Sequence, residues 1–251
     1  MRTWMLAGNW KMHNSIGDSQ KLARAIVEGV REGSGGEVVV APVFTALDAV
    51  REVIKGSRVA LAAQDVFYEE KGAYTGEVAP AMLVDAGCTY VIIGHSERRK
   101  YFHETDETVN AKVKKAFSVG LKPIVCVGET EEEREKGITE YVVGVQVKKG
   151  LYGLESLAAC TIAYEPVWAI GTGKNATPDQ AQEVHAFIRG LLRQTYGDAA
   201  AEETRILYGG SVTPENISQL IAMADIDGAL IGGASLKPES FLGIIRLVEG
   251  R

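Results

Sequence analysis

The sequence predicts an α/β protein that folds as one (β/α)8 barrel over residues 1–251. Three observations favour this fold. Short apolar runs rich in β-forming residues recur eight times, and a helical pattern follows each of them. The length of 251 residues is typical of a barrel of this kind. Finally, no shift in composition and no linker divides the chain, so we expect a single domain.

An open, doubly wound sheet is the alternative for alternating strands and helices. Nucleotide-binding sheets of that kind carry a Gly-x-Gly-x-x-Gly pattern after their first strand. Here the first predicted strand ends in Gly8-Asn9-Trp10-Lys11, which lacks the pattern. Together with the count of eight units, this favours the closed barrel.

The predicted strands are apolar runs of four to six residues, short enough to be buried strands. They cover residues 4–9, 37–41, 59–63, 90–94, 122–127, 161–164, 205–208 and 228–231.

The predicted helices follow these strands in turn. The first has an apolar face at helical spacing through Leu22, Ile26 and Val30. Two others have start signals, because Thr177-Pro178 and Thr213-Pro214 each place a capping residue before a proline, and Gln180 completes a capping box. The helices are predicted over 18–32, 45–55, 79–86, 107–119, 130–150 in two parts, 178–196, 214–222 and 239–249.

The composition excludes several classes of protein. The formal net charge is −6 and local clusters such as Glu97-Arg98-Arg99-Lys100 are mixed in sign, so we expect no nucleic-acid partner. No apolar run is long enough to cross a membrane, and the amino terminus lacks a secretory signal. The cysteines Cys88, Cys126 and Cys160 are widely spaced beside apolar runs, which indicates buried reduced thiols and a cytoplasmic location.

In a (β/α)8 barrel the functional groups lie at the carboxyl ends of the strands. The first strand ends near Asn9 and Lys11, which alternate along the chain and so can point the same way. Lys11 is then a candidate cation for an anionic substrate, although an isolated lysine is usually a solvated surface residue. The fourth strand ends at His95, followed by Glu97, which could pair with Lys11. Ser96 could cap a short helix whose dipole would lower the pKa of His95 and keep the imidazole neutral.

The sixth strand leads into Glu165, which is followed directly by Pro166. A residue before proline favours extended backbone, so Glu165 should occupy the last extended position of the strand. The segment 166–176 then resembles a hinged loop with an apolar middle that could cover a pocket. Burial under such a cover would raise the pKa of Glu165 toward neutrality, as a general base requires. The simpler interpretation is that Glu165 only caps a strand.

Paired glycines follow the last two strands, at Gly209-Gly210-Ser211 and Gly232-Gly233. Glycine pairs are common in tight turns. At two consecutive strand ends, however, they let backbone N–H groups approach an anion, and phosphate sites recur at this place in the fold. We therefore expect a phosphate site here, with a further N–H from Gly171 in the covering loop.

These motifs together resemble triosephosphate isomerase, whose fold is the TIM barrel, over the whole length of the chain. The resemblance rests on five segments in order, 7–12, 93–99, 164–173, 208–212 and 232–236. A glutamate base and a neutral histidine electrophile are established features of that family. The only departure nearby is His13, which we expect at the surface or in a subunit contact.

The resemblance implies the glycolytic and gluconeogenic interconversion of dihydroxyacetone phosphate and D-glyceraldehyde 3-phosphate through an enediolate. It implies Glu165 as base, His95 as the group that polarises the carbonyl, and Lys11 and Asn9 as groups that stabilise negative charge. Glu97 would hold Lys11 or assist proton relay. The phosphate would bind to a set of four residues, Gly171, Ser211, Gly232 and Gly233.

No cofactor and no metal is expected, because neither a nucleotide motif nor metal-ligand spacing appears. Two rivals remain: another phosphosugar enzyme on the same barrel, and a non-catalytic phosphate-binding scaffold. The segment 64–76 is long for a connection in a barrel and carries Phe67, Tyr68 and Tyr74. The resemblance implies that it inserts into a second subunit and forms a homodimer, and the alternative is a loop packed on its own surface.

Overall fold

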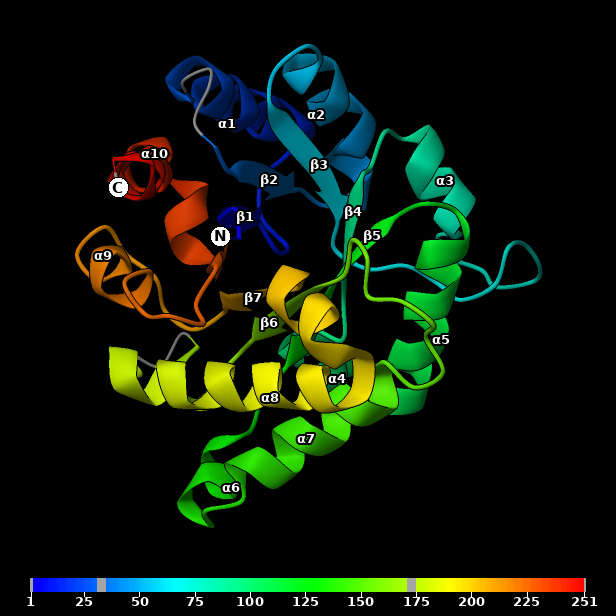
Figure 1. Ribbon diagram of the computed structural model, residues 1–251. Helices are drawn as coiled ribbons and strands as arrows, with labels where there is room; N and C mark the ends of the chain where they lie inside the picture. The colour runs from blue at the N-terminus through cyan, green and yellow to red at the C-terminus, as the bar shows by residue number, and fades with distance from the viewer. Residues whose placement is uncertain (1, 31–34, 171–174, 251) are drawn as a thin grey trace.

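The computed structural model describes residues 2–30, 35–170 and 175–250, and the strands in it form a closed parallel barrel. Each strand pairs with the next, and β1 pairs with both β2 and β8. Helices surround the strands on the outside (Figure 1). The strands are β1 (Met5–Asn9), β2 (Glu37–Ala41), β3 (Val59–Ala63), β4 (Tyr90–Ile93), β5 (Lys122–Val127), β6 (Thr161–Tyr164), β7 (Arg205–Tyr208) and β8 (Gly228–Ile231). The predicted barrel and its strands are therefore confirmed.

The helices follow the strands as predicted, with several short additions. The α-helices are α1 (Ile16–Gly29), α2 (Leu47–Ile54), α3 (Pro80–Asp85), α4 (Ser96–Phe102), α5 (Asp106–Ser118), α6 (Glu131–Glu135), α7 (Thr139–Gly150), α8 (Pro178–Glu203), α9 (Ile217–Leu220) and α10 (Pro238–Glu249). The 3-10 helices are η1 (Phe44–Ala46), η2 (Val167–Ala169) and η3 (Gly233–Leu236). No helix within the described residues is both long and apolar enough to span a membrane.

Apolar side chains alternate along each strand and so form two cores. Inside the barrel lie side chains such as Met5, Ile92 and Leu207, and all of them are buried. Outside it, residues such as Leu6 and Ile162 pack beneath the helices in a larger core. The three cysteines are free and buried, as predicted.

Several helix boundaries differ from the prediction by one to three residues, as in α1, and three further differences are informative. His95, and not Ser96, is the cap of α4, because its ring nitrogen accepts the N–H of Glu97. The predicted end of α8 near residue 196 coincides with a kink at Gly197, where φ is 87°, but helical structure resumes to Glu203. The helix predicted over 214–222 is shorter, since α9 begins at Ile217 and the residues before it form turns.

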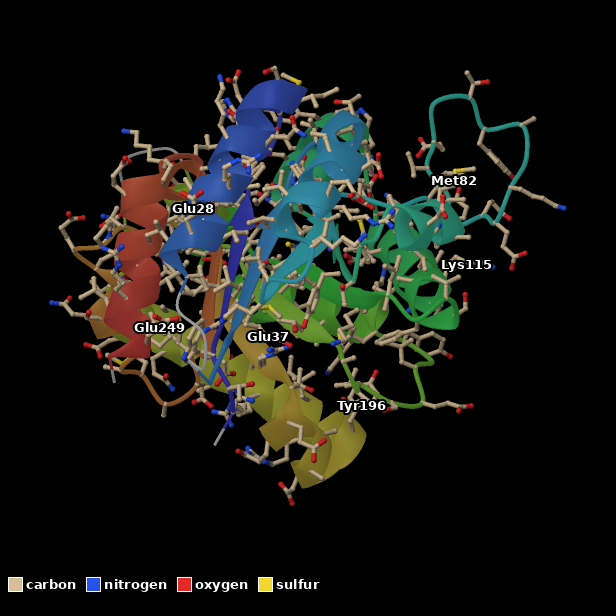
Figure 2. All side chains as sticks on the ribbon, turned by 90° about the horizontal axis from the view of Figure 1, so that it is seen from above. Glu28, Glu37, Met82, Lys115, Tyr196 and Glu249 are labelled. Atoms are coloured by element: carbon tan, nitrogen blue, oxygen red, sulfur yellow. The ribbon has the colours of Figure 1, made fainter. Side chains whose placement is uncertain are left out.

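The connection between β3 and α3 projects from the barrel. Figure 2 shows it extending beyond the helices on the side where Met82 is labelled. Phe67 packs against Tyr68 and Tyr74, with ring centroids 4.3 and 4.8 Å apart. Even so, Tyr74 is 44% exposed. The predicted long aromatic loop is therefore present, and it covers only part of its own apolar surface.

Candidate active site

A pocket of about 490 Å³ lies at the carboxyl ends of the strands. It brings together residues from β1, from the turn after β4, and from the segments after β6, β7 and β8. Of the predicted site residues, it is lined by Asn9, Lys11, His95, Glu165, Ser211, Gly232 and Gly233. Glu97 does not line the pocket but forms an ion pair with Lys11, which does. Gly171 lies outside the described residues.

Lys11 occupies an unusual backbone position. Asn9 is the last residue of β1, so strand alternation does not extend to Lys11, which has φ of 50°. The side chain of Asn9 accepts the N–H of Lys11 at 3.0 Å, and Gln64 donates to the Lys11 carbonyl at 2.8 Å. The two predicted residues thus share the pocket, but a turn after β1, and not strand alternation, places Lys11 there. The sequence reasoning missed Gln64, because a glutamine in a loop carries no local signal.

The ammonium group of Lys11 forms the predicted ion pair with Glu97. The distance between Nζ and Oε1 is 2.6 Å. Both groups are partly exposed, so the pair contributes little to stability and serves mainly to orient the lysine. A carboxylate oxygen of Glu97 also lies 3.7 Å from Nδ1 of His95, so Glu97 is close to both the lysine and the histidine of the site.

His95 and Glu165 are in direct contact across the buried floor of the pocket. Nε2 of His95 lies 2.9 Å from Oε1 of Glu165, and the Ser96 N–H donates to Oε2 at 2.9 Å. On the other side of the ring, Nδ1 accepts the N–H of Glu97 at 3.2 Å. With Nδ1 acting as an acceptor, the ring proton lies on Nε2 and points at the carboxylate.

This contact reverses the two predicted pKa shifts. Burial raises the pKa of Glu165, but His95, the Ser96 N–H and Lys11 stabilise the carboxylate, and the net pKa is lowered. Burial lowers the pKa of His95, but the facing carboxylates of Glu165 and Glu97 raise it above its ordinary value. The prediction of a raised Glu165 pKa and a lowered His95 pKa is therefore wrong for this state of the site. The reason is that each side chain favours the charged form of the other.

Glycines shape the part of the pocket that follows β7 and β8. A Cβ at Gly209 would lie 2.8 Å from Cγ of Glu165, and one at Gly210 would lie 2.3 Å from the hydroxyl of Tyr208. Gly232 precedes η3, whose first residue is Gly233. These residues and Ser211 form an open, backbone-rich surface suited to an anion. Lys237 also lines the pocket and adds a positive charge that the sequence reasoning did not identify.

The segment after Glu165 is anchored at its first turn. Trp168 donates from Nε1 to Glu129 at 2.8 Å, and the hydroxyl of Tyr164 lies 3.1 Å from the same carboxylate. Glu129 is fully buried and also pairs with Arg134 at 3.3 Å. The predicted covering loop therefore begins at a rigid point. Residues 171–174, its centre, lie outside the described part of the chain.

Two other features bear on the assignment. A larger cavity, of about 1170 Å³, lies near the amino ends of the strands beside Arg205 and Cys160, and none of the predicted site residues lines it.

Within residues 2–30, 35–170 and 175–250, no group of three or more histidine, cysteine or acidic side chains is arranged to hold a metal. His13 is exposed, in agreement with its assignment to the surface.

The fold and the pocket define a class of protein: (β/α)8-barrel enzymes that carry a carboxylate, an imidazole and an ammonium group beside an anion-binding surface. Comparison with known proteins identifies the member of this class. Residues 4–248 match the family model for triosephosphate isomerase, and the chain belongs to that family.

Curated relatives extend over nearly the whole chain. A protein named triosephosphate isomerase from Carboxydothermus hydrogenoformans is 57% identical over 98% of this chain and 99% of its own length. A second protein of that name, from Pelobacter propionicus, is 57% identical over 98% of both chains. A third, from Geotalea uraniireducens, is 53% identical over 99% of this chain and all of its own length.

Proposed function

We propose that Glu165, His95 and Lys11 carry out the reaction of the family, the interconversion of dihydroxyacetone phosphate and D-glyceraldehyde 3-phosphate. The observation that carries this assignment is the direct contact of a buried carboxylate with a buried imidazole in a pocket that also contains a lysine. A base, a proton donor and a cation are the three groups that enolisation beside a carbonyl requires.

Glu165 is the proposed base. It removes the proton from the carbon beside the carbonyl and returns it to the neighbouring carbon, so the enzyme is unchanged after one turnover. In the structure its carboxylate is occupied by His95 and Ser96. Substrate must therefore draw it away from both, and the loss of these contacts lets burial raise its pKa when it acts.

His95 is the proposed electrophile. Its Nε2 proton can be donated to the carbonyl oxygen, and the ring can then shuttle a proton between the two oxygens of the enediol. Lys11 stabilises the negative charge that develops on the substrate, with Asn9 beside it. Glu97 holds the lysine at 2.6 Å, and we propose orientation as its main role.

The phosphate group is proposed to bind on Ser211, Gly232 and Gly233, with an additional N–H from Gly171. Lys237 lines the same pocket and adds a positive charge near these residues. Binding energy from the phosphate can then be used to order the reacting carbons. Closure of the segment 166–176 would exclude water and protect the enediolate. We propose no cofactor and no metal for this reaction.

The two rival functions have less support. Another phosphosugar enzyme on this barrel would share the glycines but would have no need for Lys11, His95 and Glu165 together. A non-catalytic scaffold would have no need for the buried pair, since bringing ionisable groups out of water costs free energy.

The test is a coupled assay for dihydroxyacetone phosphate formed from glyceraldehyde 3-phosphate, with wild type compared with Glu165→Gln. Removal of the base should reduce kcat by about 10² to 10⁴-fold. Equal turnover in the two proteins would refute the role of Glu165. Absence of turnover in folded wild type would refute the reaction itself.

We further propose that residues 1–251 form a single domain and that two copies assemble as a homodimer through the 64–76 loop. The pairing of β1 with β8 supports the first proposal. The exposed aromatic surface of the loop supports the second. We propose a cytoplasmic location, with neither nucleic acid nor membrane as a partner.

A further inference from the structure

Gly128 follows the last residue of β5, and a distant side chain completes its backbone hydrogen bonds. The Gly128 N–H donates to Oε1 of Gln146 at 2.7 Å. Nε2 of the same amide donates to the Gly128 carbonyl at 3.1 Å. Gln146 lies on α7, outside the barrel. Its amide thus bonds the peptide groups of Gly128 as a neighbouring strand would, at a point where β5 has ended.

Gly128 lies directly against Glu165. A Cβ at position 128 would be 1.7 Å from the carbonyl oxygen of Glu165 and 2.6 Å from its carbonyl carbon. The N–H of Glu165 donates to the carbonyl of Val127 at 2.7 Å. On the opposite side, Gly209 is close to Cγ of Glu165. The position of the Gly128 peptide therefore determines where the backbone of Glu165 can lie.

The space behind this contact is open. A cavity of about 530 Å³ is lined by Gln146, Gly128 and Glu165 together with Val167 and Trp168. Without the amide of Gln146, Gly128 would have two unsatisfied backbone groups and free volume beside it. Unsatisfied peptide groups move toward water or toward a new partner. A shift of Gly128 into the cavity would release Glu165 and the first turn of the covering segment.

We infer that Gln146 is a positioning residue for the catalytic base, a role that rests on the function proposed for Glu165. It acts through Gly128 and is not part of the lining of the substrate pocket. A misplacement of a reacting group by about 1 Å can reduce the rate by roughly 100-fold. Loss of the Gln146 amide should therefore affect kcat far more than substrate binding.

The experiment compares Gln146→Met with a matched control, Gln182→Met. Gln182 likewise uses both the oxygen and the nitrogen of its amide to bond to a single residue, Asp225. It accepts the Asp225 N–H at 3.0 Å and donates to the Asp225 carboxylate at 2.6 Å. It lines neither the pocket nor the cavity behind Glu165. The two substitutions remove comparable hydrogen bonds at comparable burial, so a general loss of stability should be similar in both.

We expect kcat of Gln146→Met to fall by about 10-fold or more. KM and the inhibition constant of inorganic phosphate should change little, because Gln146 does not line the pocket. Gln182→Met should keep the kcat of wild type. Gln146→Glu, which has nearly the same size but lacks the donor to Gly128, should also lose kcat. The assay is run at a temperature where circular dichroism shows all proteins folded.

Equal kcat in Gln146→Met and Gln182→Met would overturn the inference, and so would a change confined to KM. If both Gln146 variants fail to fold while Gln182→Met folds, Gln146 is a folding residue and the inference is wrong. The wild-type assay separates these outcomes from a failure of the proposed function, which would appear as absence of turnover in wild type itself.

Discussion

At the scale of single residues, the behaviour of Glu165 depends on a contact that no local pattern contains. Burial alone predicts a raised pKa, and burial does act in that direction. The imidazole 2.9 Å away comes from a different strand and has the larger effect in combination with the Ser96 N–H and Lys11. The residue types could be read from the sequence, but their protonation could not, because it depends on the distance between two strand ends.

A second buried histidine gives a prediction for pH. His185 is fully buried, its Nδ1 lies 3.2 Å from the Asp225 carbonyl, and its Nε2 has no hydrogen-bond partner among the described residues. Burial lowers the pKa of His185 to about 4. The unfolded chain, with a histidine pKa of about 6.5, binds the proton more readily. Stability should therefore fall as pH falls from about 6.5 to 4, by about 3 kcal/mol from this residue.

The check is the free energy of unfolding against pH for wild type and His185→Gln. The variant should lose much of this slope between pH 6.5 and 4, whatever its stability at neutral pH. His103→Asn is the control, because His103 is exposed and asparagine tolerates its left-handed backbone. Identical slopes in wild type and His185→Gln would contradict the prediction.

At the scale of elements, capping residues decided which helix boundaries could be predicted. Thr177 and Gln180 form the expected capping box at the start of α8. The similar Thr213-Pro214 sequence begins only a turn. The Asn216 carboxamide accepts the Thr213 N–H, as that of Gln180 accepts the Thr177 N–H, but the Asn216 N–H bonds to the Thr213 carbonyl and not to its hydroxyl. The two starts look alike in sequence, and they differ in whether the Thr hydroxyl accepts the backbone N–H three residues later, as it does from Gln180.

The capping box of α8 gives a prediction about the covering segment, which ends where this helix begins. Thr177→Ala should reduce the free energy of unfolding by about 1 kcal/mol, because the Gln180 N–H loses its acceptor. Chemical denaturation measures the change. Thr177→Ser retains the hydroxyl and should lie within a few tenths of a kcal/mol of wild type. A loss of the same size in both variants would show that packing of the methyl group, and not capping, is responsible.

At the scale of the whole molecule, the exposed aromatic loop gives a prediction about assembly. Tyr74 is 44% exposed, and Met82 and Phe102 are 56% and 65% exposed. We expect sedimentation at micromolar concentration to give twice the chain mass of 27.0 kDa. Tyr74→Asp should shift the protein toward monomer, because it places a charge on an apolar surface. Tyr141→Asp, which changes a tyrosine 72% exposed on α7, should not. A monomeric wild type would refute the homodimer.

The barrel as a whole was predictable because each unit carries its own local signal. Apolar runs such as Thr161–Tyr164 identify strands, and the parallel order follows once eight strand–helix units are counted. The site residues that lie at or just after the carboxyl ends of strands could be predicted, because the fold places its functional groups there. Gln146 and Lys237 were missed because each comes from outside the strand ends and reaches its place only when the barrel closes. Gln64 directly follows β3, but a glutamine there carries no signal that its amide bonds to the Lys11 carbonyl.

The seam between the first and last strands has a consequence for synthesis on the ribosome. Met5 pairs with Gly228, where a Cβ would lie 1.9 Å from the Met5 carbonyl oxygen, and Arg2 pairs with Asp227 at 2.6 Å. At about 5–20 residues per second, β1 is made roughly 10 to 45 s before β8. During that interval one edge of β1 is an unpaired template, open to strands of other nascent chains. Synthesis of β8 therefore ends this exposure, because β8 pairs with the free edge of β1.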